Sequence, residues 1–345
     1  MSRVSGEPVV VLGEVIEPGV RRDMWIPLGH RPDGSPLGIP LVVINGAKPG
    51  KQLSLIAGVH GDEFENCEGL RRFVNALDPA DVSGVIIATP QANAGAFDGA
   101  SRHSVVDHLD LNRQFPGDES GFLTQRIGAA LVNTFVPFAD LLLDMHSGGM
   151  VLGLEPFVGF DPTPGAVGEA SLELAKSAGI PMLYGSVPFA NVLRLAAAQQ
   201  GVASVLVEIG SEGRLREELV DMSVETLTRV AAHYGIVDTA TPFAPMEQFT
   251  LLVAHESGEF LHAATGGFLT HRVALGDEVT RGQILGAVTD PFGTVLDEIV
   301  APHDGVIAEL RTVPVLHTGD WTYAVIPSRG TFAGTATLED LEIVR

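Results

Sequence analysis

Short apolar runs alternate with helix-like patterns through the middle of the chain, from residue 53 to residue 234. Aliphatic runs bounded by glycine or polar turns predict buried strands at 53–57, 85–88, 141–144 and 204–207. Apolar residues that recur every three or four positions predict helices over 64–77, 122–136, 166–178 and 215–233. This alternation predicts an α/β fold, with a mixed, largely parallel sheet flanked by helices.

The two ends of the chain have a different pattern. Residues 8–50 hold β-branched runs separated by prolines and glycines, which predicts antiparallel strands leading into the main sheet. Over residues 257–327 the segments are short and extended, with glycines between them and no helical pattern. We therefore predict an α/β domain over residues 1–245 and a small all-β domain over residues 246–345.

The composition narrows the classes of protein to consider. Hydrophobic residues make up 45% of the chain, yet no apolar run reaches the ~18 residues of a membrane span. The net charge of −22 argues against a nucleic-acid partner, which needs a basic surface. A single cysteine, Cys67, and no signal-like pattern over residues 1–7 predict a cytoplasmic protein without disulfides.

Histidine and glutamate side chains stand where two predicted strands end. His60 and Glu63 lie on the turn that follows the strand 53–57, and His146 follows the strand 141–144. Strand ends of an open α/β sheet meet at one edge, so these side chains can converge. Imidazole nitrogen and carboxylate oxygen suit Zn²⁺, so the three residues are candidate ligands. A His-x-x-Glu pair also arises by chance, as ordinary turn residues.

Two carboxylates near these ends are further candidates. Glu208 closes the strand 204–207 at the same expected edge, where it could serve as general base for a metal-activated water. Asp144 lies two residues before His146, on the same strand face, and could orient that imidazole. A capping or surface role for Glu208, and a backbone contact for Asp144, stay open.

Arginines supply candidate anion sites. Asn112 and Arg113 place an amide beside a guanidinium fork, which can clamp a substrate carboxylate. They follow a long irregular stretch inside the α/β pattern, and such loops often build sites. Arg113 could equally cap a surface loop. Arg102 and Arg194 are additional candidates for substrate binding.

Four short motifs follow one another between about residues 50 and 235. They are His60-Gly61-Asp62-Glu63, Asp110-Leu111-Asn112-Arg113, Asp144-Met145-His146-Ser147 and Val207-Glu208-Ile209-Gly210. In this order they resemble the succinylglutamate desuccinylase/aspartoacylase group of zinc deacylases, which is related to the zinc carboxypeptidases. The resemblance implies a zinc carboxypeptidase-like fold and one Zn²⁺ per chain, with His60, Glu63 and His146 as ligands and Glu208 as general base.

Within this group, residues 60–65 and 112–117 are most similar to the branch that removes acetyl from N-acetyl-diaminobutyrate in ectoine breakdown. The resemblance implies that Asn112 and Arg113 contact the substrate. The family's upstream arginine lies nearer to this pair than Arg102 does here, which leaves the identity of the substrate open.

The end of the chain carries a second resemblance. Glycine-containing motifs at 266–268, 276–279, 282–286 and 301–307 resemble a biotinyl/lipoyl-type β-sandwich. No lysine follows Lys176, so this part of the chain has no residue to carry a prosthetic group. In the relatives such a domain borders the active-site cleft.

These patterns together predict a metal-dependent amidohydrolase acting on linear amides. We expect the substrate to be a small N-acyl amino acid, such as an N-acetyl-diaminobutyrate-like or succinylglutamate-like compound. We also expect a homo-oligomer with no nucleic-acid or membrane partner. Two alternatives stay open: a zinc carboxypeptidase acting on short peptides, and a non-catalytic binding protein whose zinc site has decayed.

Overall fold

The computed structural model describes residues 6–254 and 260–343. Most of the N-terminal stretch that we interpreted as lacking a signal, residues 1–5, lies outside the described residues. The same holds for residues 255–259 of the predicted β domain. Among the described helices, none combines the length and apolar character needed to span a membrane.

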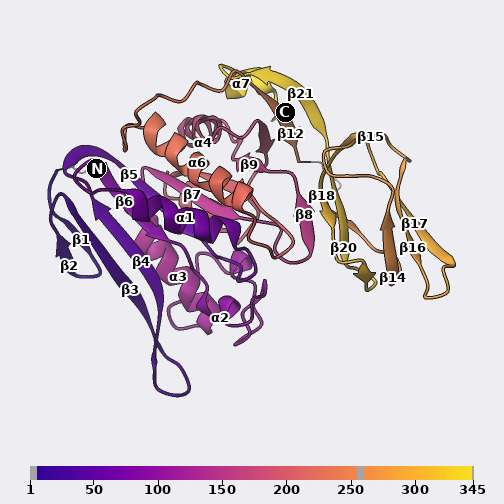
Figure 1. Cartoon of the computed structure of the whole chain (residues 1–345), viewed down its shortest axis with the longest axis horizontal. Coiled ribbons are helices and arrows are strands. Elements are labelled where there is room, and N and C mark those ends of the chain that lie inside the picture. The colour runs from indigo at the N-terminus through magenta and orange to yellow at the C-terminus, as the bar shows by residue number, and fades with distance from the viewer. Residues whose placement is uncertain (1–5, 255–259, 344–345) are drawn as a thin grey trace.

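A ten-stranded mixed sheet forms the centre of the molecule (Figure 1). In sheet order its strands are β21 (Ser328–Ala333), β12 (Gln248–Val253), β10 (Met182–Gly185), β9 (Phe157–Phe160), β11 (Ala203–Glu208), β7 (Leu141–His146), β5 (Lys48–Ala57), β6 (Ser83–Thr89), β4 (Pro36–Asn45) and β3 (Val20–His30). Strands β11, β7, β5 and β6 run parallel, as do β12, β10 and β9. The antiparallel pair of β9 and β11 joins the two runs. The predicted mixed, largely parallel sheet is confirmed.

Helices cover both faces of this sheet. On one face lie α1 (Glu65–Ala76), α4 (Ala166–Ser177) and α6 (Glu217–His233). On the other lie α3 (Leu123–Phe135) and α5 (Leu193–Ala198). Strand β5 shows why two cores form: Leu53 and Leu55 pack into the first, while Ile56 points into the second.

The N-terminal strands agree with their prediction. The hairpin of β1 (Val9–Val11) and β2 (Glu14–Ile16) packs on the second core. Strands β3 and β4 pair antiparallel, and β4 pairs antiparallel with β6, which leads the chain into the parallel run. The predicted strands 53–57, 85–88, 141–144 and 204–207 all lie within β5, β6, β7 and β11.

Two smaller antiparallel sheets stand at one end of the molecule (Figure 1). The first consists of β13 (Phe260–His262), β20 (Trp321–Ile326), β18 (Gly305–Arg311) and β15 (Glu278–Val279). The second consists of β17 (Val295–Val300), β16 (Ile284–Thr289), β14 (Gly267–His271) and β19 (Val315–Leu316). They enclose a shared apolar core that includes Leu269, Ile307 and Val325.

A short strand from the α/β part of the chain fixes these sheets in place. Strand β8 (Leu152–Leu154) pairs antiparallel with β18. Beside it, Phe157 and Tyr184 of the main sheet share a buried cluster with Val306 and Ile326 of the small sheet. The small sheets are therefore held against the main sheet by a ladder and by apolar packing.

The segment 246–345, predicted as a separate β domain, is divided in the structure. Its central part forms the small sheets, whereas β12 and β21 extend the main sheet at its edge. Phe249 of β12 is buried and stacks on Phe332 of β21, with ring centroids 6.0 Å apart. A pattern of short extended runs predicts strands without indicating which sheet each one joins. The domain boundary at residue 245 stays a prediction.

Short helices complete the described chain: α2 (Ala94–Phe97), the 3-10 turn η1 (Leu111–Arg113) and α7 (Leu338–Leu341). The first two lie in the irregular stretch before α3, where the sequence predicted a site-building loop.

Candidate active site

His60 and Glu63 lie on the tight turn between β5 and α1. Gly58 has a φ of +73°, and a Cβ there would lie 2.7 Å from the ring of Phe97 on α2. At Gly61, a Cβ would lie 2.1 Å from the carbonyl carbon of Ala96. Because the turn packs this closely on α2, both side chains are buried beneath it, His60 at 1% and Glu63 at 2% exposure.

Three metal-ligating side chains converge at this turn. His146, at the end of β7, places its Nδ1 3.3 Å from the Nδ1 of His60. One oxygen of Glu63 lies 2.5 Å from His60 Nδ1 and the other 3.1 Å from His146 Nδ1. One donor atom from each residue lies within 4.8 Å of the other two. The three side chains proposed as ligands thus face one point.

The outer nitrogens of both imidazoles contact carboxylates. His60 Nε2 lies 3.1 Å from Asp110 Oδ1, and His146 Nε2 lies 3.0 Å from Asp144 Oδ1. A carboxylate that accepts the Nε2 proton leaves the lone pair on Nδ1, which here points inward. The orienting role predicted for Asp144 agrees with this geometry, whereas Asp110 was missed as a partner.

The electrostatics of the cluster favour positive charge at its centre. Burial lowers the pKa of His146, but the charges of Asp144 and Glu63 raise it well above its usual range. Burial has the opposite effect on the pKa of Glu63, which it raises, yet the charges of His60 and His146 hold that pKa below its usual range. Two imidazole nitrogens and a carboxylate form a donor set that divalent transition metals accept. These residues therefore fit a metal ion.

Glu208 lies beside the cluster on the neighbouring strand. It ends β11 and stands in direct register with His146 of β7. Its Oε2 is buried without a hydrogen-bond partner in the described part of the chain. Burial raises the pKa of Glu208 well above its usual range, Glu63 and Glu309 raise it further, and His146 opposes them. A carboxyl group in this position can hold and release a proton next to the candidate metal.

Asn66 of α1 ties the two strand ends together. Its Nδ2 donates to the carbonyl of His146 at 2.5 Å and to the carbonyl of Ile209 at 3.2 Å. Ser223 of α6 donates to Asn66 Oδ1 at 2.7 Å, so the amide is held from behind. A single buried side chain therefore fixes the spacing between the ligand strand and the Glu208 strand. The sequence analysis missed Asn66, although it lies only three residues after Glu63.

All nine candidate residues proposed from the sequence line one cavity of about 130 Å³. They are His60, Glu63, Arg102, Asn112, Arg113, Asp144, His146, Arg194 and Glu208. The cavity is closed on one side by side chains of the first small sheet, namely Phe260, Glu309 and Trp321. The sequence analysis named none of these three.

The polar side chains that the α/β part of the chain contributes to this cavity differ in their hydrogen-bond and ion-pair partners. Arg102 is held by Asp110 at 3.0 Å and lies 5.6 Å from the ring centroid of Trp321. Arg194 is buried, with 6% of its surface exposed, and within the described residues its Nη1 lacks a hydrogen-bond partner. Asn112 Oδ1 is also buried and unpaired there. Arg113 is exposed and donates to the carbonyl of Asn112 at 2.7 Å.

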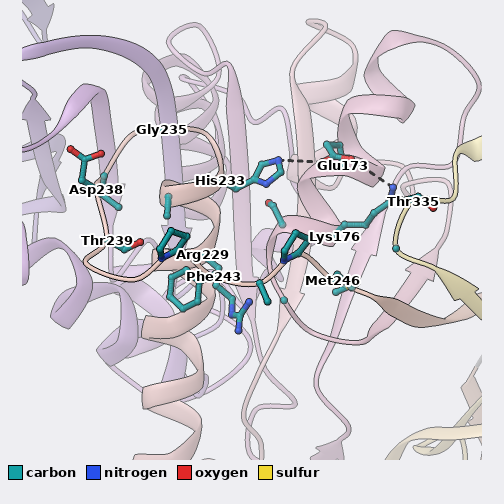
Figure 2. Close-up of a pocket in the computed structure, with 18 residues that line it drawn as sticks. Glu173, Lys176, Arg229, His233, Gly235, Asp238, Thr239, Phe243, Met246 and Thr335 are labelled. Atoms are coloured by element: carbon teal, nitrogen blue, oxygen red, sulfur yellow. Dashed lines mark ion pairs between the residues drawn. The ribbon is translucent and has the colours of Figure 1, made fainter.

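A larger hollow of about 430 Å³ lies between α4, α6 and residues 242–246, and none of the candidate ligands lines it. Figure 2 shows His233 and Lys176 on either side of Glu173. Glu173 lies 3.1 Å from His233 Nε2 and 3.7 Å from Lys176 Nζ, while Arg229 pairs at 2.8 Å with a glutamate of its own helix. These are mutually paired side chains at the surface, and we assign no chemistry to them.

Comparisons with known proteins agree with this geometry. Residues 49–234 match the family model described as the succinylglutamate desuccinylase/aspartoacylase catalytic domain. An N-alpha-acetyl-L-2,4-diaminobutyric acid deacetylase from Halomonas elongata is 32% identical over 293 residues, which covers 84% of this chain and 85% of the relative.

Solved structures show the same fold. The product-bound ectoine utilization protein EutE (DoeB) from Ruegeria pomeroyi superposes with a TM-score of 0.83 at 25% identity, covering 93% of this chain and 98% of that one. A succinylglutamate desuccinylase/aspartoacylase from Rhodobacter sphaeroides gives 0.80 at 25% identity, covering 89% and 95%.

The resemblance drawn from the sequence motifs is thereby confirmed. The family model spans more than half of the chain and includes every candidate ligand and Glu208. This protein belongs to the succinylglutamate desuccinylase/aspartoacylase family, and it is a metal-dependent amidohydrolase acting on linear amides.

Proposed function

We propose that this enzyme is a zinc-dependent deacylase that hydrolyses the amide bond of a small N-acyl amino acid. The observation that carries the proposal is the meeting of His60, Glu63, His146 and Glu208 at one cavity that arginines also line. Relatives are named for N-acetyl-diaminobutyrate and for succinylglutamate, so both kinds of substrate are candidates.

His60, Glu63 and His146 would hold one Zn²⁺ per chain. When bound, zinc supplies a Lewis acid for the acyl carbonyl and lowers the pKa of water to about 7. The two oxygens of Glu63 lie on the inner side of both imidazoles, while Asp110 and Asp144 hold the outer Nε2 protons. This arrangement keeps both Nδ1 atoms available as ligands.

Glu208 would move the proton. In this proposal its buried Oε2 accepts a proton from the attacking water and then delivers it to the leaving nitrogen. Because burial raises the pKa of Glu208, its carboxylate is a stronger base than an exposed glutamate. Register with His146 keeps this group beside the ligands throughout.

The arginines would bind the substrate carboxylate. Arg113 offers a guanidinium fork at the rim of the cavity, and Asn112 lies next to it. Arg194 is buried, and its Nη1 has no hydrogen-bond partner in the described chain, so this donor is available to a substrate carboxylate. Arg102, already paired with Asp110, would shape the entrance and add positive charge.

The size of the cavity favours small substrates. About 130 Å³ is enclosed by the main sheet and the side chains of Phe260 and Trp321, which leaves little room for a peptide. We therefore favour the deacylase over the carboxypeptidase alternative. The complete donor set together with Glu208 speaks against a decayed, non-catalytic site.

Activity assays with purified protein test the proposal. Acetyl, succinyl and formyl derivatives of acidic and basic amino acids should be compared with dipeptides, alongside metal analysis. We expect about one zinc per chain and hydrolysis of at least one N-acyl amino acid at a higher kcat/KM than any dipeptide. Cleavage of dipeptides alone, or the absence of both zinc and hydrolysis, would reject the proposal.

We also keep the expectation of a cytoplasmic homo-oligomer. Light scattering after size-exclusion chromatography measures the molar mass directly, and a value of 36.3 kDa would show a monomer instead.

A further inference from the structure

The small sheet places one acidic side chain inside the active-site cavity. Glu309 lies on β18, has 9% of its surface exposed, and lines the cavity together with the candidate ligands. Glu208 lines the same cavity, so two carboxyl groups from different sheets share it. Neither the proposed metal binding nor the binding of a substrate carboxylate requires a second acidic side chain beside Glu208 in this cavity.

A β-bulge aims Glu309 at the cavity. In β18, Ile307 and Leu310 both pack into the core between the small sheets, although strict alternation would put them on opposite faces. The register shift between residues 307 and 309 removes this conflict, because Ala308 then packs in the cluster against the main sheet and Glu309 lines the cavity. Bulges often re-aim a side chain beside an active site.

Across the small sheet, Glu309 lies in a row with an aromatic ring. It pairs in register with Leu154 of β8 on one side and with Ala324 of β20 on the other, and Ala324 pairs with Phe260 of β13. In this row Ala324 separates Glu309 from Phe260, and both of these larger side chains line the cavity. Phe260 stacks on Trp321 with centroids 4.8 Å apart, so a second ring extends the wall.

A carboxylate beside aromatic rings is a surface that recognises cations. The carboxylate supplies charge and hydrogen-bond acceptors, and the ring faces add cation–π attraction. The arginines on the α/β wall provide the opposite charge for a carboxylate. Such a cavity complements a dipolar ligand that carries one anionic and one cationic end.

We propose that Glu309 is a specificity residue that binds a free ammonium group of the substrate, so that the enzyme selects N-acyl amino acids with an amine side chain. The inference rests on the proposed deacylase function and sharpens it. A succinylglutamate-type substrate carries a carboxylate in place of the amine, and Glu309 would repel that group.

Three substrates of nearly equal shape test the inference with the zinc-loaded enzyme. They are the Nα-acetyl derivatives of 2,4-diaminobutyrate, norvaline and glutamate, whose side chains end in an ammonium, a methyl and a carboxylate. We expect the wild type to prefer the diaminobutyrate derivative over the norvaline derivative by about 10- to 100-fold in kcat/KM, the range of a charge-assisted hydrogen bond. Glu309→Gln should reduce this preference to about threefold or less, chiefly by losing activity on the cationic substrate.

Glu278→Gln is the matched control, since Glu278 is an exposed glutamate of the same small sheet. It should keep the wild-type preference. If Glu309→Gln fails to fold, Glu309→Asp retains the charge and should keep the direction of preference at a lower kcat/KM. An equal loss on the cationic and neutral substrates, or a wild type without a preference for the cation, would overturn the inference.

The inference and the proposed function can fail separately. If the wild type hydrolyses none of the acetyl, succinyl and formyl derivatives of the activity screen, the deacylase proposal fails. Calorimetric binding of 2,4-diaminobutyrate and norvaline to the zinc-loaded protein then decides the role of Glu309. Tighter binding of the diamine that Glu309→Gln abolishes supports the inference, and equal binding of both amino acids overturns it.

Discussion

The active-site cavity has two walls of different construction. On the α/β wall, the candidate ligands and Glu208 stand at strand ends or on the turn after a strand, where the backbone leaves the sheet. On the other wall, Glu309 and Trp321 lie within strands of a small sheet, with Glu309 at the β-bulge of β18. The first wall brings together reactive groups, and the second presents shape and charge. The proposed reacting groups therefore lie on the first wall, and the proposed selectivity for an amine lies on the second.

The two walls are also held by different forces. Buried hydrogen bonds fix the α/β wall, with Asn66 spanning two strand ends and Gly148 donating to the carbonyl of Gly210 at 3.1 Å. The other wall is held by the ladder between β8 and β18 and by the apolar cluster around Phe157 and Ile326. Mutations on the α/β wall should therefore reduce the rate of reaction, whereas mutations on the other wall should change substrate binding.

Removal of the metal should have the largest effect on activity, because the proposed reaction depends on the ion that the three ligands of the α/β wall would hold. Dialysis against a zinc chelator is expected to reduce hydrolysis to background, and added Zn²⁺ should restore it. The metal content and circular dichroism should be followed in parallel, so that unfolding is distinguished from loss of metal. His146→Ala should lose zinc permanently. Full activity in metal-free protein would contradict the assignment.

Glu208→Gln should have the next largest effect. The amide keeps the shape of the side chain but cannot accept a proton, so kcat should fall by about 10²–10⁴-fold. Zinc content should not change, since Glu208 is not one of the three proposed ligands. Glu218→Gln, at an exposed position of α6, is the matched control. Turnover close to that of the wild type would reject Glu208 as the general base.

The α/β wall could be predicted from the sequence because each strand end is marked by a short local sequence pattern. An apolar run that ends at a turn containing a histidine and glycine, as at His60 and His146, marks both the end of a strand and a side chain with metal-binding chemistry. The parallel arrangement then brings such ends together at one edge. Both the sheet and the candidate ligands could be predicted without coordinates for this reason.

The other wall could not be predicted, because its contacts are set by long-range pairing. The direction of Glu309 depends on a bulge and on the pairing of β18 with β8, about 155 residues earlier in the chain. Alternation alone would place Glu309 on the same face as Ile307. Asp110 was missed for a similar reason, since its imidazole partner lies 50 residues away.

Asp110→Asn should have an intermediate effect. The change removes the charge that faces His60 Nε2, so zinc affinity or activity should fall by about 10- to 100-fold. Asp107→Asn is the matched control in the same loop, because Asp107 bonds Thr124 at the start of α3 and no candidate ligand. Competition with a zinc chelator measures the affinity. Equal affinities in the two variants would mean that Asp110 does not support the ligand.

The smallest effect should come from loosening the second wall. Ile326→Val removes one methylene from the cluster between the small sheet and the main sheet, and it should lower the free energy of unfolding by about 1 kcal/mol. Ile127→Val makes the same chemical change in the core beneath α3, with a similar expected cost. Both side chains are buried, so stability alone cannot distinguish the two sites.

Kinetics should distinguish them. Ile326 lies on β20 with Ala324 and Trp321, so its truncation should let the cavity wall shift and raise KM while kcat and zinc content stay unchanged. Ile127→Val should leave KM unchanged, because Ile127 packs in the second core and not in the cluster that joins the small sheet to the main sheet. Denaturant unfolding gives the stability of each variant, and steady-state assays give KM. If both variants raised KM equally, the cavity would respond to core packing in general, and the division of the site into a reactive and a selective wall would be wrong.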